Sequence, residues 1–307
     1  MRRNKSKKSY LVKAPAKINI GLRVLSKRKD GYHNLETIFY PVKIYDDIKL
    51  DIEKLTAAAK NNIIKVISKP NGNIPNKKNI CYRAVKLFLN EFNIKDKYRI
   101  TINIKKNIPI GAGLGGGSSD AASVLKILYK HYLPEPGFVF MFDSGSKKKM
   151  LKQVQHDKLL GITQDIGSDV PFFLLGKPAF AEGKGEKLTP LPKFRVNGKI
   201  LLVNPGIHIS TPWAFKEIGI KSKKKKILNK IHKFDTNNEA LMINDFERVV
   251  FKKYPKIEKI KYDMYKLGAS FSLMSGSGST VYGIFNSAKI KTAEKYFIDK
   301  GFKVFIS

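Results

Sequence analysis

The stretch Pro109-Ile-Gly-Ala-Gly-Leu-Gly-Gly-Gly-Ser-Ser-Asp120 lies between a predicted strand and a predicted helix. Residues 98–104 alternate apolar and polar side chains, as a strand does, and residues 119–132 carry apolar side chains at helical spacing. Five of the seven residues at positions 111–117 are glycine, which lets a backbone approach a ligand closely. The start of the helix offers unpaired N–H groups and a partial positive charge. This junction is typical of a phosphate-binding loop, and a flexible linker is the alternative.

The glycine spacing does not fit the two best-known phosphate loops. Gly111, Gly113 and Gly116 formally match the dinucleotide fingerprint. That fingerprint also needs an acidic residue about twenty positions later, where this chain has Glu135 between two prolines. A Walker A loop has its lysine at the position that Gly117 occupies. A side-chain cation for the phosphate must therefore come from elsewhere in the chain.

Composition restricts the class of protein. At 307 residues the chain is long enough for two domains, and 42% hydrophobic residues supply a packed core. No apolar run approaches the ~20 residues that a membrane span needs. The basic start of the chain is not followed by the apolar segment of a signal peptide, and the single cysteine, Cys81, fits a reducing compartment. We therefore expect a soluble, cytoplasmic protein.

The formal net charge of +34 predicts attraction to anions. Only eight of the 59 basic residues are Arg, which is the better residue for bidentate contacts to phosphates and bases. Uniform enrichment in Lys indicates a compositional bias, so we expect no specific nucleic-acid partner. The alternative is a noncatalytic RNA-binding protein, whose binding would depend steeply on salt.

The order of predicted elements indicates an α+β protein with two domains, residues 1–177 and 178–307, and a boundary uncertain by about ten residues. The first half has predicted strands over residues 10–25, 37–45, 47–52 and 98–104, a helix capped by Asn79 and a helix over 119–132. Residues 60–78 form a polar region rich in Asn, Lys, Pro and Gly, and residues 134–161 are predicted as a surface excursion with one short candidate helix around residues 150–160. The second half has predicted strands over 199–203, 269–285 (two, with a tight loop) and 302–306, and helices over 238–251, 255–267 and 288–300. This order predicts an antiparallel sheet with helices on one face.

Several polar or aromatic side chains stand where a purely structural role would be unusual. Lys17 interrupts an apolar strand, which is costly for an unpaired charge, although a lysine on an edge strand can extend to solvent. Asp169 lies in a short loop before an apolar run, where it is either a reactive carboxylate or a helix cap. Tyr32 and His33 follow a turn and could contact a base, whereas Tyr32 could equally be a core aromatic.

Three motifs resemble those of the GHMP small-molecule kinases: residues 14–19, residues 109–121 and residues 275–280. Further motifs at residues 30–33, 166–173 and 179–186 are similar to the members of this family whose substrate carries a cytidine diphosphate group. The likeness runs from about Val12 to Ile306. It implies a two-domain GHMP kinase fold, with an N-terminal domain like ribosomal protein S5 domain 2 and a ferredoxin-like C-terminal domain. It also implies transfer of the γ-phosphoryl group of ATP to a substrate hydroxyl.

The resemblance assigns roles to individual residues. Asp169 would accept the proton of the substrate hydroxyl, and Lys17 would pair with Asp169 and stabilise charge on the transferring phosphoryl group. Tyr32 and Phe215 would sandwich the cytosine while His33 bonds its edge. Asn19 and Thr211 would make polar contacts to the substrate, and residues 275–280 would close the site. The ATP-binding residues implied by the second motif are Pro109, Ile110, Gly111, Ala112, Gly113, Leu114, Gly115, Gly116, Gly117, Ser118 and Ser119.

The sequence predicts no dedicated metal site, because neither His-Glu-x-x-His nor paired cysteines occur. Magnesium is expected to arrive with ATP. A homoserine or mevalonate kinase of the same family is the nearest alternative, since a small aliphatic substrate needs no aromatic sandwich. The interval between Asp120 and Asp169 is longer than this family leads us to expect, and the excess falls in residues 134–161.

Overall fold

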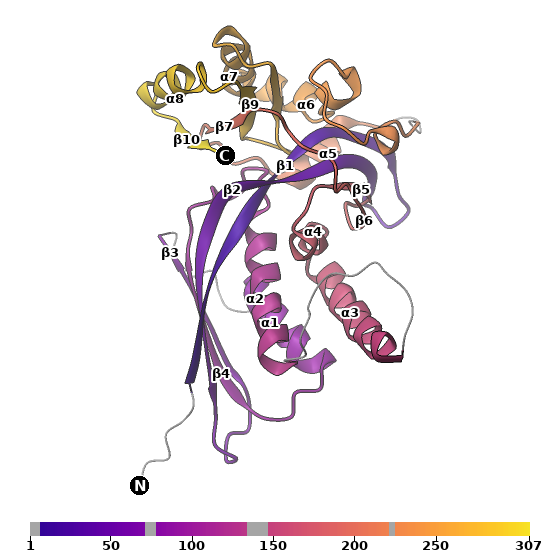
Figure 1. The fold of residues 1–307 in the computed structure, drawn as a ribbon, viewed down its shortest axis with the longest axis vertical. Helices are drawn as coiled ribbons and strands as arrows, with labels where there is room; N and C mark the ends of the chain where they lie inside the picture. The colour runs from indigo at the N-terminus through magenta and orange to yellow at the C-terminus, as the bar shows by residue number, and fades with distance from the viewer. Residues whose placement is uncertain (1–6, 71–77, 134–146, 221–224) are drawn as a thin grey trace. The chain divides into compact units, whose positions relative to one another are not determined.

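The computed structural model describes residues 7–70, 78–133, 147–220 and 225–307 (Figure 1). The chain forms two compact units, and each combines several stretches of sequence. The first unit comprises residues 1–14, 45–107 and 117–175, and the second comprises residues 15–44, 108–116 and 176–307. The division into domains at residue 177 stays a prediction, because the long strands β1 (Lys7–Lys27) and β2 (His33–Lys54) each contribute to both units.

The first unit is a sheet covered by helices on one face (Figure 1). Residues 47–54 of β2 pair antiparallel with β4 (Tyr98–Lys105), and β4 pairs in parallel with β3 (Ile63–Lys69). Helix α1 (Ile80–Glu91) makes the crossover that two parallel strands require. The remaining helices are α2 (Gly116–Tyr132), α3 (Lys147–Ile166) and α4 (Val170–Leu175).

Helix α1 begins where the sequence predicted. The side-chain oxygen of Asn79 accepts a hydrogen bond from the backbone N–H of Cys81 at 2.8 Å, which confirms the predicted N-cap. Cys81 and Phe88 of α1 are buried, as are Ile100 and Ile102 of β4. The period-two pattern of β4 therefore identified the buried face of the sheet correctly.

The second unit contains a four-stranded antiparallel sheet in the order β10-β7-β9-β8. Its strands are β7 (Lys199–Asn204), β8 (Phe271–Met274), β9 (Val281–Phe285) and β10 (Lys303–Ile306). The helices of this unit are α5 (Thr211–Ile218), α6 (Glu247–Lys253), α7 (Pro255–Lys266) and α8 (Ile290–Asp299), with 3₁₀ turns η2 (Leu228–Lys230) and η3 (Glu239–Met242). Strands β5 (Ala179–Gly183) and β6 (Lys187–Pro190) pair with each other, and β5 pairs with residues 35–39 of β2.

Strand β7 is buried on both faces. Leu201 and Val203 belong to the apolar cluster that contains residues of α5–α8. Ile200 and Leu202 belong to a second cluster, which contains apolar residues of β1 and β2. Burial on both faces explains why β7 is a continuous apolar run instead of an alternating one.

Several predicted elements differ from the structure. The predicted strands 37–45 and 47–52 form the single strand β2, and β3 lies within the polar region 60–78, where no strand was predicted. Residues 134–146 of the predicted excursion lie outside the described residues, and α3 follows them. The single helix predicted over residues 238–251 is wrong, because a bridge residue and a turn at residues 243–246 separate η3 from α6. Among the described residues, no helix has both the length and the apolar character needed to cross a membrane.

Candidate active site

The glycine loop, residues 109–116, packs tightly against the motif at residues 275–280 within the second unit. Ser275 Oγ donates a hydrogen bond to the carbonyl oxygen of Gly113 at 2.9 Å. A Cβ atom on residue 113 would lie 2.0 Å from the carbonyl oxygen of Ser275, and φ of Gly113 is +77°. Only glycine combines this backbone angle with so close an approach. The packing therefore explains why the loop needs a glycine at position 113, whatever ligand it binds.

Alternate residues fix this loop to the core and leave its backbone accessible. Ala112 and Leu114 are buried, whereas Gly111 is exposed. The carbonyl oxygen of Ala112 accepts from the N–H of Thr280 at 3.3 Å, and that of Leu114 accepts from the N–H of Lys17 at 3.0 Å. Strand β1 and the third motif thus hold the loop in one conformation, with an exposed glycine backbone, as a phosphate-binding loop requires.

Lys17 supplies a cation at the glycine loop. Its side chain is buried, and its Nζ donates to Asn19 Oδ1 at 2.5 Å and to the carbonyl oxygen of Gly113 at 3.1 Å. The ammonium also lies 5.1 Å from the centre of the Phe39 ring. A lysine extending from an edge strand to solvent is thereby excluded. The loop lacks a lysine of its own, and Lys17 brings one to it from a different strand.

Asn19 connects the first and third motifs. Its Nδ2 donates to Thr37 Oγ1 at 3.1 Å, and its backbone N–H donates to Ser275 Oγ at 3.3 Å. Its carbonyl oxygen accepts from the hydroxyl of Tyr282 at 2.9 Å. The Asn19 side chain is buried and already bonded on both ends, so in this structure it positions Lys17 and residues 275–280. Direct contact of Asn19 with a substrate stays a prediction.

The residues predicted to hold a base lie together in the second unit, in a different arrangement from a simple sandwich. His33 stacks on Phe215 with ring centres 4.8 Å apart and planes 13° from parallel. Tyr32 is 59% exposed, and the Lys184 ammonium lies 4.6 Å from the centre of its ring. Burial and the nearby positive charge of Lys27 lower the pKa of His33, which favours the neutral imidazole. The predicted sandwich of a base between Tyr32 and Phe215 stays a prediction.

Thr211 and Asp169 lie at the starts of short helices. Thr211 begins α5 and its Oγ1 is 2.8 Å from Oγ of Ser277, which ties this predicted substrate residue to the third motif. Asp169 is half-buried in the turn that precedes α4, where the N–H of Val170 donates to the carbonyl oxygen of Gly167 at 3.1 Å. Asp169 belongs to the first unit and Lys17 to the second. Their pairing stays a prediction.

Sequence comparison identifies the relatives of this chain. Residues 79–177 match the family profile "GHMP kinases N terminal domain", and residues 224–303 match "GHMP kinases C terminal". A 4-diphosphocytidyl-2-C-methyl-D-erythritol kinase of Cytophaga hutchinsonii is 38% identical over 278 residues, which cover 89% of this chain and 91% of the relative. The chain belongs to the 4-diphosphocytidyl-2-C-methyl-D-erythritol kinase family. Another member, from Clostridium botulinum strain Hall, is 38% identical over 283 residues and covers 90% of this chain and 91% of its own length.

Solved structures agree with this membership. A crystal structure of 4-(cytidine 5'-diphospho)-2C-methyl-D-erythritol kinase superposes with a TM-score of 0.71 at 30% identity, covering 97% of this chain and 98% of that one. A homoserine kinase from Cytophaga hutchinsonii reaches a TM-score of 0.66 at 17% identity, covering 100% and 96%. At that identity the second match shows the common fold alone. The predicted α+β fold of the GHMP kinases is confirmed.

A buried charge cluster at the start of α2 was not predicted from the sequence. Lys106 Nζ lies 2.8 Å from Asp120 Oδ2 and also forms an ion pair with Asp46. All three side chains are almost completely buried, and the N–H of Asn107 donates to Asp46 Oδ1 at 2.6 Å. Burial is the main cause that raises the pKa of Asp120 to about 7; Lys106 opposes this shift and Asp46 adds to it. The cluster fixes the helix that follows the glycine loop.

Ser119 and Asp120 each keep an unpaired atom at this helix start. Ser119 Oγ and Asp120 Oδ1 are buried and have no hydrogen-bond partner among the described residues. Nor do these residues include a group of three or more His, Cys, Asp and Glu side chains able to hold a metal ion.

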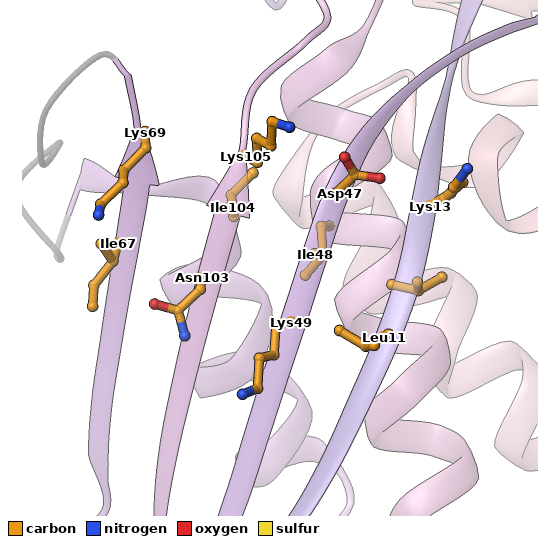
Figure 2. Close-up of a pocket in the computed structure, with 11 residues that line it drawn as sticks. Leu11, Lys13, Asp47, Ile48, Lys49, Ile67, Lys69, Asn103, Ile104 and Lys105 are labelled. Carbon is orange, nitrogen blue, oxygen red and sulfur yellow. The ribbon is translucent and has the colours of Figure 1, made fainter.

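A pocket of about 740 Å³ lies on the first unit's sheet, on the face turned away from its helices (Figure 2). Its lining includes the apolar side chains of Ile67 and Leu11 and the basic side chains of Lys13, Lys49 and Lys105. None of its lining residues is a predicted site residue. Exposed lysines on an apolar sheet face are expected in a chain with so much Lys, and this pocket does not contribute to the glycine loop or the base site.

Proposed function

We propose that this chain transfers the γ-phosphoryl group of ATP to the 2-hydroxyl group of 4-diphosphocytidyl-2-C-methyl-D-erythritol, in the non-mevalonate route to isoprenoid precursors. The observation that carries the proposal is the contact between the Lys17 ammonium and the carbonyl oxygen of Gly113 at 3.1 Å. This contact brings a cation to a glycine loop whose own residues, 109–116, include no lysine or arginine. Membership of the 4-diphosphocytidyl-2-C-methyl-D-erythritol kinase family supports the choice of substrate.

The glycine loop and the start of α2 would bind the triphosphate of ATP. Phosphoryl transfer depends mostly on position and on stabilisation of charge, and the protein does little covalent chemistry. The exposed backbone of the loop and the helix N-terminus supply hydrogen-bond donors, and Lys17 supplies a positive charge. Magnesium would enter with the nucleotide and neutralise phosphate oxygens, and the unpaired buried hydroxyl of Ser119 is compatible with a polar ligand at this helix start.

Asp169 is proposed as the group that accepts the proton of the substrate hydroxyl. Its position in a turn, half-buried before α4, is suitable for a carboxylate that must meet a substrate. The base site is proposed to comprise Tyr32, His33 and Phe215. Because His33 covers one face of Phe215, a cytosine that stacks on that face must first displace the imidazole. We further propose that the domain boundary lies near residue 177 and that the enzyme is cytoplasmic.

A substrate-dependent assay of ADP release tests the proposal. The wild-type enzyme is expected to release ADP with 4-diphosphocytidyl-2-C-methyl-D-erythritol and not with homoserine or mevalonate, and ³¹P NMR of the product should show a new monoester on the 2-hydroxyl group. Competition by CDP against the substrate checks the base site separately. Turnover of homoserine or mevalonate alone would contradict the proposal, as would RNA binding with a steep salt dependence and no ADP release.

Two pairs of variants test the proposed roles. Asp169→Asn should lower kcat by about 10² to 10⁴ with the KM for ATP nearly unchanged. Asp165→Asn, an exposed aspartate at the end of α3, is the matched control. Lys17→Met should lower kcat while the protein remains folded, with exposed Lys13→Met on the same strand as its control. A loss of less than tenfold in Asp169→Asn would remove Asp169 from the role of base.

A further inference from the structure

A short segment, residues 244–247, links three parts of the proposed active site. It comprises the turn between η3 and α6 and the first residue of α6, where the sequence predicted continuous helix. Asn244 forms a parallel bridge with Leu22 of β1: the N–H of Leu22 donates to the carbonyl of Ile243 at 2.7 Å, and the N–H of Asp245 donates to the carbonyl of Leu22 at 2.9 Å. Asp245 Oδ2 also accepts from the N–H of Val24 at 2.7 Å. The 244–247 segment is therefore anchored to the strand that carries Lys17 and Asn19.

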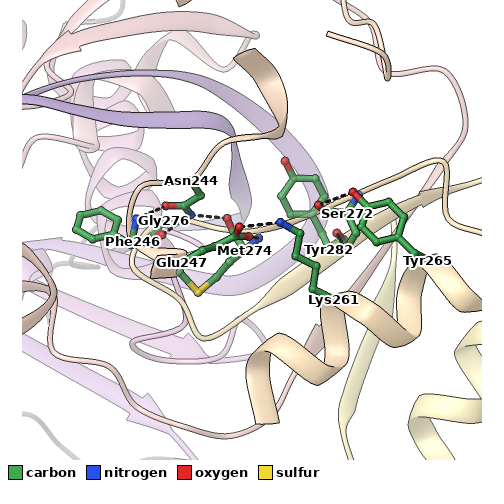
Figure 3. A network of polar contacts seen from close by, with 9 residues as sticks. All are labelled: Asn244, Phe246, Glu247, Lys261, Tyr265, Ser272, Met274, Gly276 and Tyr282. Atoms are coloured by element: carbon green, nitrogen blue, oxygen red, sulfur yellow. Dashed lines mark hydrogen bonds and ion pairs between the residues drawn. The ribbon is translucent and has the colours of Figure 1, made fainter. Parts of the chain in front are cut away.

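The amide of Asn244 holds the third motif by its backbone (Figure 3). Its Nδ2 donates to the carbonyl oxygens of Met274 at 2.7 Å and Gly276 at 2.8 Å, and its Oδ1 accepts from the N–H of Phe246 at 3.0 Å. The side chain is buried, so no water competes for these bonds. The two carbonyl groups flank Ser275, the residue that bonds to Gly113. Asn244 thus fixes Ser275 on both sides.

Glu247 holds the same loop from the neighbouring position. Its Oε1 accepts from the N–H of Met274 at 2.9 Å, and its Oε2 forms an ion pair with Lys261 Nζ at 2.7 Å (Figure 3). Met274 therefore has both its N–H and its carbonyl group bonded to side chains of the 244–247 segment. The strand end that leads into residues 275–280 cannot shift without breaking these bonds.

Phe246 extends the segment to the proposed base site. Its ring meets Phe215 edge to face, with centres 4.9 Å apart and planes at 85°. Phe215 in turn stacks on His33. Edge-to-face pairs constrain the orientation of both rings, so Phe246 determines which face Phe215 presents to His33 or to a base.

We propose that the 244–247 segment is a positioning element that sets the third motif against the glycine loop through Asn244 and orients Phe215 through Phe246. The inference rests on the proposed function, because it takes the glycine loop as the ATP site and Phe215 as part of the base site. None of the four side chains is proposed to touch a substrate. The segment acts through Ser275 on one side and through Phe215 on the other, so the two effects are separable in kinetics.

The first test is Asn244→Asp, which keeps the size of the side chain and the acceptor for Phe246. A carboxylate cannot donate to the carbonyl oxygens of Met274 and Gly276, so the loop should lose its position. The expected result is a fall in kcat/KM for ATP of about 10- to 100-fold, because misplacement of this order is costly for a positioned reaction. Asn238→Asp is the matched control: Asn238 Oδ1 accepts from the N–H of Ala240 at 3.1 Å as a helix cap, a role that Asp fills equally well. Its kinetic constants should stay within twofold of wild type.

The second test is Phe246→Leu, which removes the ring contact to Phe215. The KM for the cytidine substrate should rise about 3- to 10-fold, as expected for loss of one aromatic pair, while the KM for ATP stays within twofold. Phe297→Leu, in the same apolar cluster but on α8, controls for a core defect alone and should lower the melting temperature without changing either KM.

The outcomes separate the inference from the proposed function. A wild-type enzyme without activity contradicts the proposed function before any variant is made. With an active wild type, kinetic constants of folded Asn244→Asp within twofold of wild type overturn the role of Asn244. If Phe246→Leu lowers kcat only in proportion to the fraction of folded protein and leaves both KM values unchanged, the proposed link from Phe246 to Phe215 is overturned. A non-additive loss in the double variant of Asn244→Asp with Ser275→Ala supports action through Ser275, and additive losses contradict it.

Discussion

The start of α2 and the third motif are fixed by different chemistry. At the start of α2, the ammonium of Lys106 lies buried between the carboxylates of Asp120 and Asp46. At the third motif, the uncharged amide of Asn244 makes the buried contacts. The ion pair that assists it, between Lys261 and Glu247, keeps side-chain exposures of 21% and 12%.

The two arrangements differ in how completely their polar atoms are paired. The amide of Asn244 uses both donors and its acceptor, whereas Asp120 Oδ1 has no partner among the described residues. Two carboxylates also share one ammonium at α2, and the pKa of Asp120 is raised to about 7, mainly by burial. A saturated neutral network should respond to changes of shape, while the charge cluster should respond to pH and to loss of its cation.

The largest expected effect is that of Lys106→Met. This change leaves the buried carboxyl groups of Asp46 and Asp120 without their cation, which costs about 3 to 5 kcal/mol of unfolding free energy. Lys105→Met, at the adjacent exposed position on the sheet, should stay within about 0.5 kcal/mol of wild type. Urea denaturation at pH 7.5 measures both. A loss below about 1 kcal/mol in Lys106→Met would show that water already reaches the cluster.

The sequence contained a local signal for the charge cluster. The period of two that identifies Ile100, Ile102 and Ile104 as buried continues to Lys106, and the period of Ile48 and Leu50 runs back to Asp46. Both charges were therefore predictable on the buried face. Local pattern also singled out the glycine loop and Lys17 as candidate site residues. A run of glycines and a lysine within an apolar strand can both be recognised from residues that are neighbours in the sequence.

The sequence contained no such signal for the 244–247 segment. Apolar spacing over residues 238–251 fits a helix, and the helix is interrupted because Asn244 and Asp245 bond to Met274 and Leu22, which are distant along the chain. The stack of His33 on Phe215 is likewise a contact between distant residues. Periodicity describes neighbours along one element, so it predicted these elements and missed the bonds that join them.

Asn244→Ala should have the second-largest effect on stability. It leaves the carbonyl groups of Met274 and Gly276 and the N–H of Phe246 without their partner, which costs about 3 kcal/mol. Since no ionisable group is removed, the loss should be constant from pH 5.5 to 8. Asn103→Ala on the sheet face of the first unit is the control, expected within about 0.5 kcal/mol. A loss that changes with pH would contradict the separation between a neutral and a charged network.

Asp120→Asn should alter the pH dependence of stability. The pKa of the Asp120 carboxyl is about 7 in the folded chain against an ordinary 3.8, so the folded state retains a proton that the unfolded state has released. Wild type should therefore lose stability relative to Asp120→Asn as pH rises from about 4 to about 7, by at most about 1.4 kcal/mol per pH unit. Urea denaturation at closely spaced pH values measures this difference. A difference that stays flat across this range would mean that Asp120 is ionised throughout.

Lys261→Met should have the smallest effect, although it too removes a lysine from a carboxylate. The Lys261 side chain is 21% exposed, against 8% for Lys106, and Glu247 keeps its bond from the N–H of Met274, so the expected loss is about 1 kcal/mol. In 1 M NaCl, where the Debye length is about 3 Å, part of that loss should disappear, whereas the loss in Lys106→Met should persist in full because its ion pairs are more completely buried. Urea denaturation of both variants at low and high salt makes the comparison. If the loss of stability in Lys261→Met were equal at both salt concentrations, exposure would not explain the difference between the Lys261–Glu247 pair and the Lys106 cluster. The number of carboxylates that share one ammonium would explain it instead.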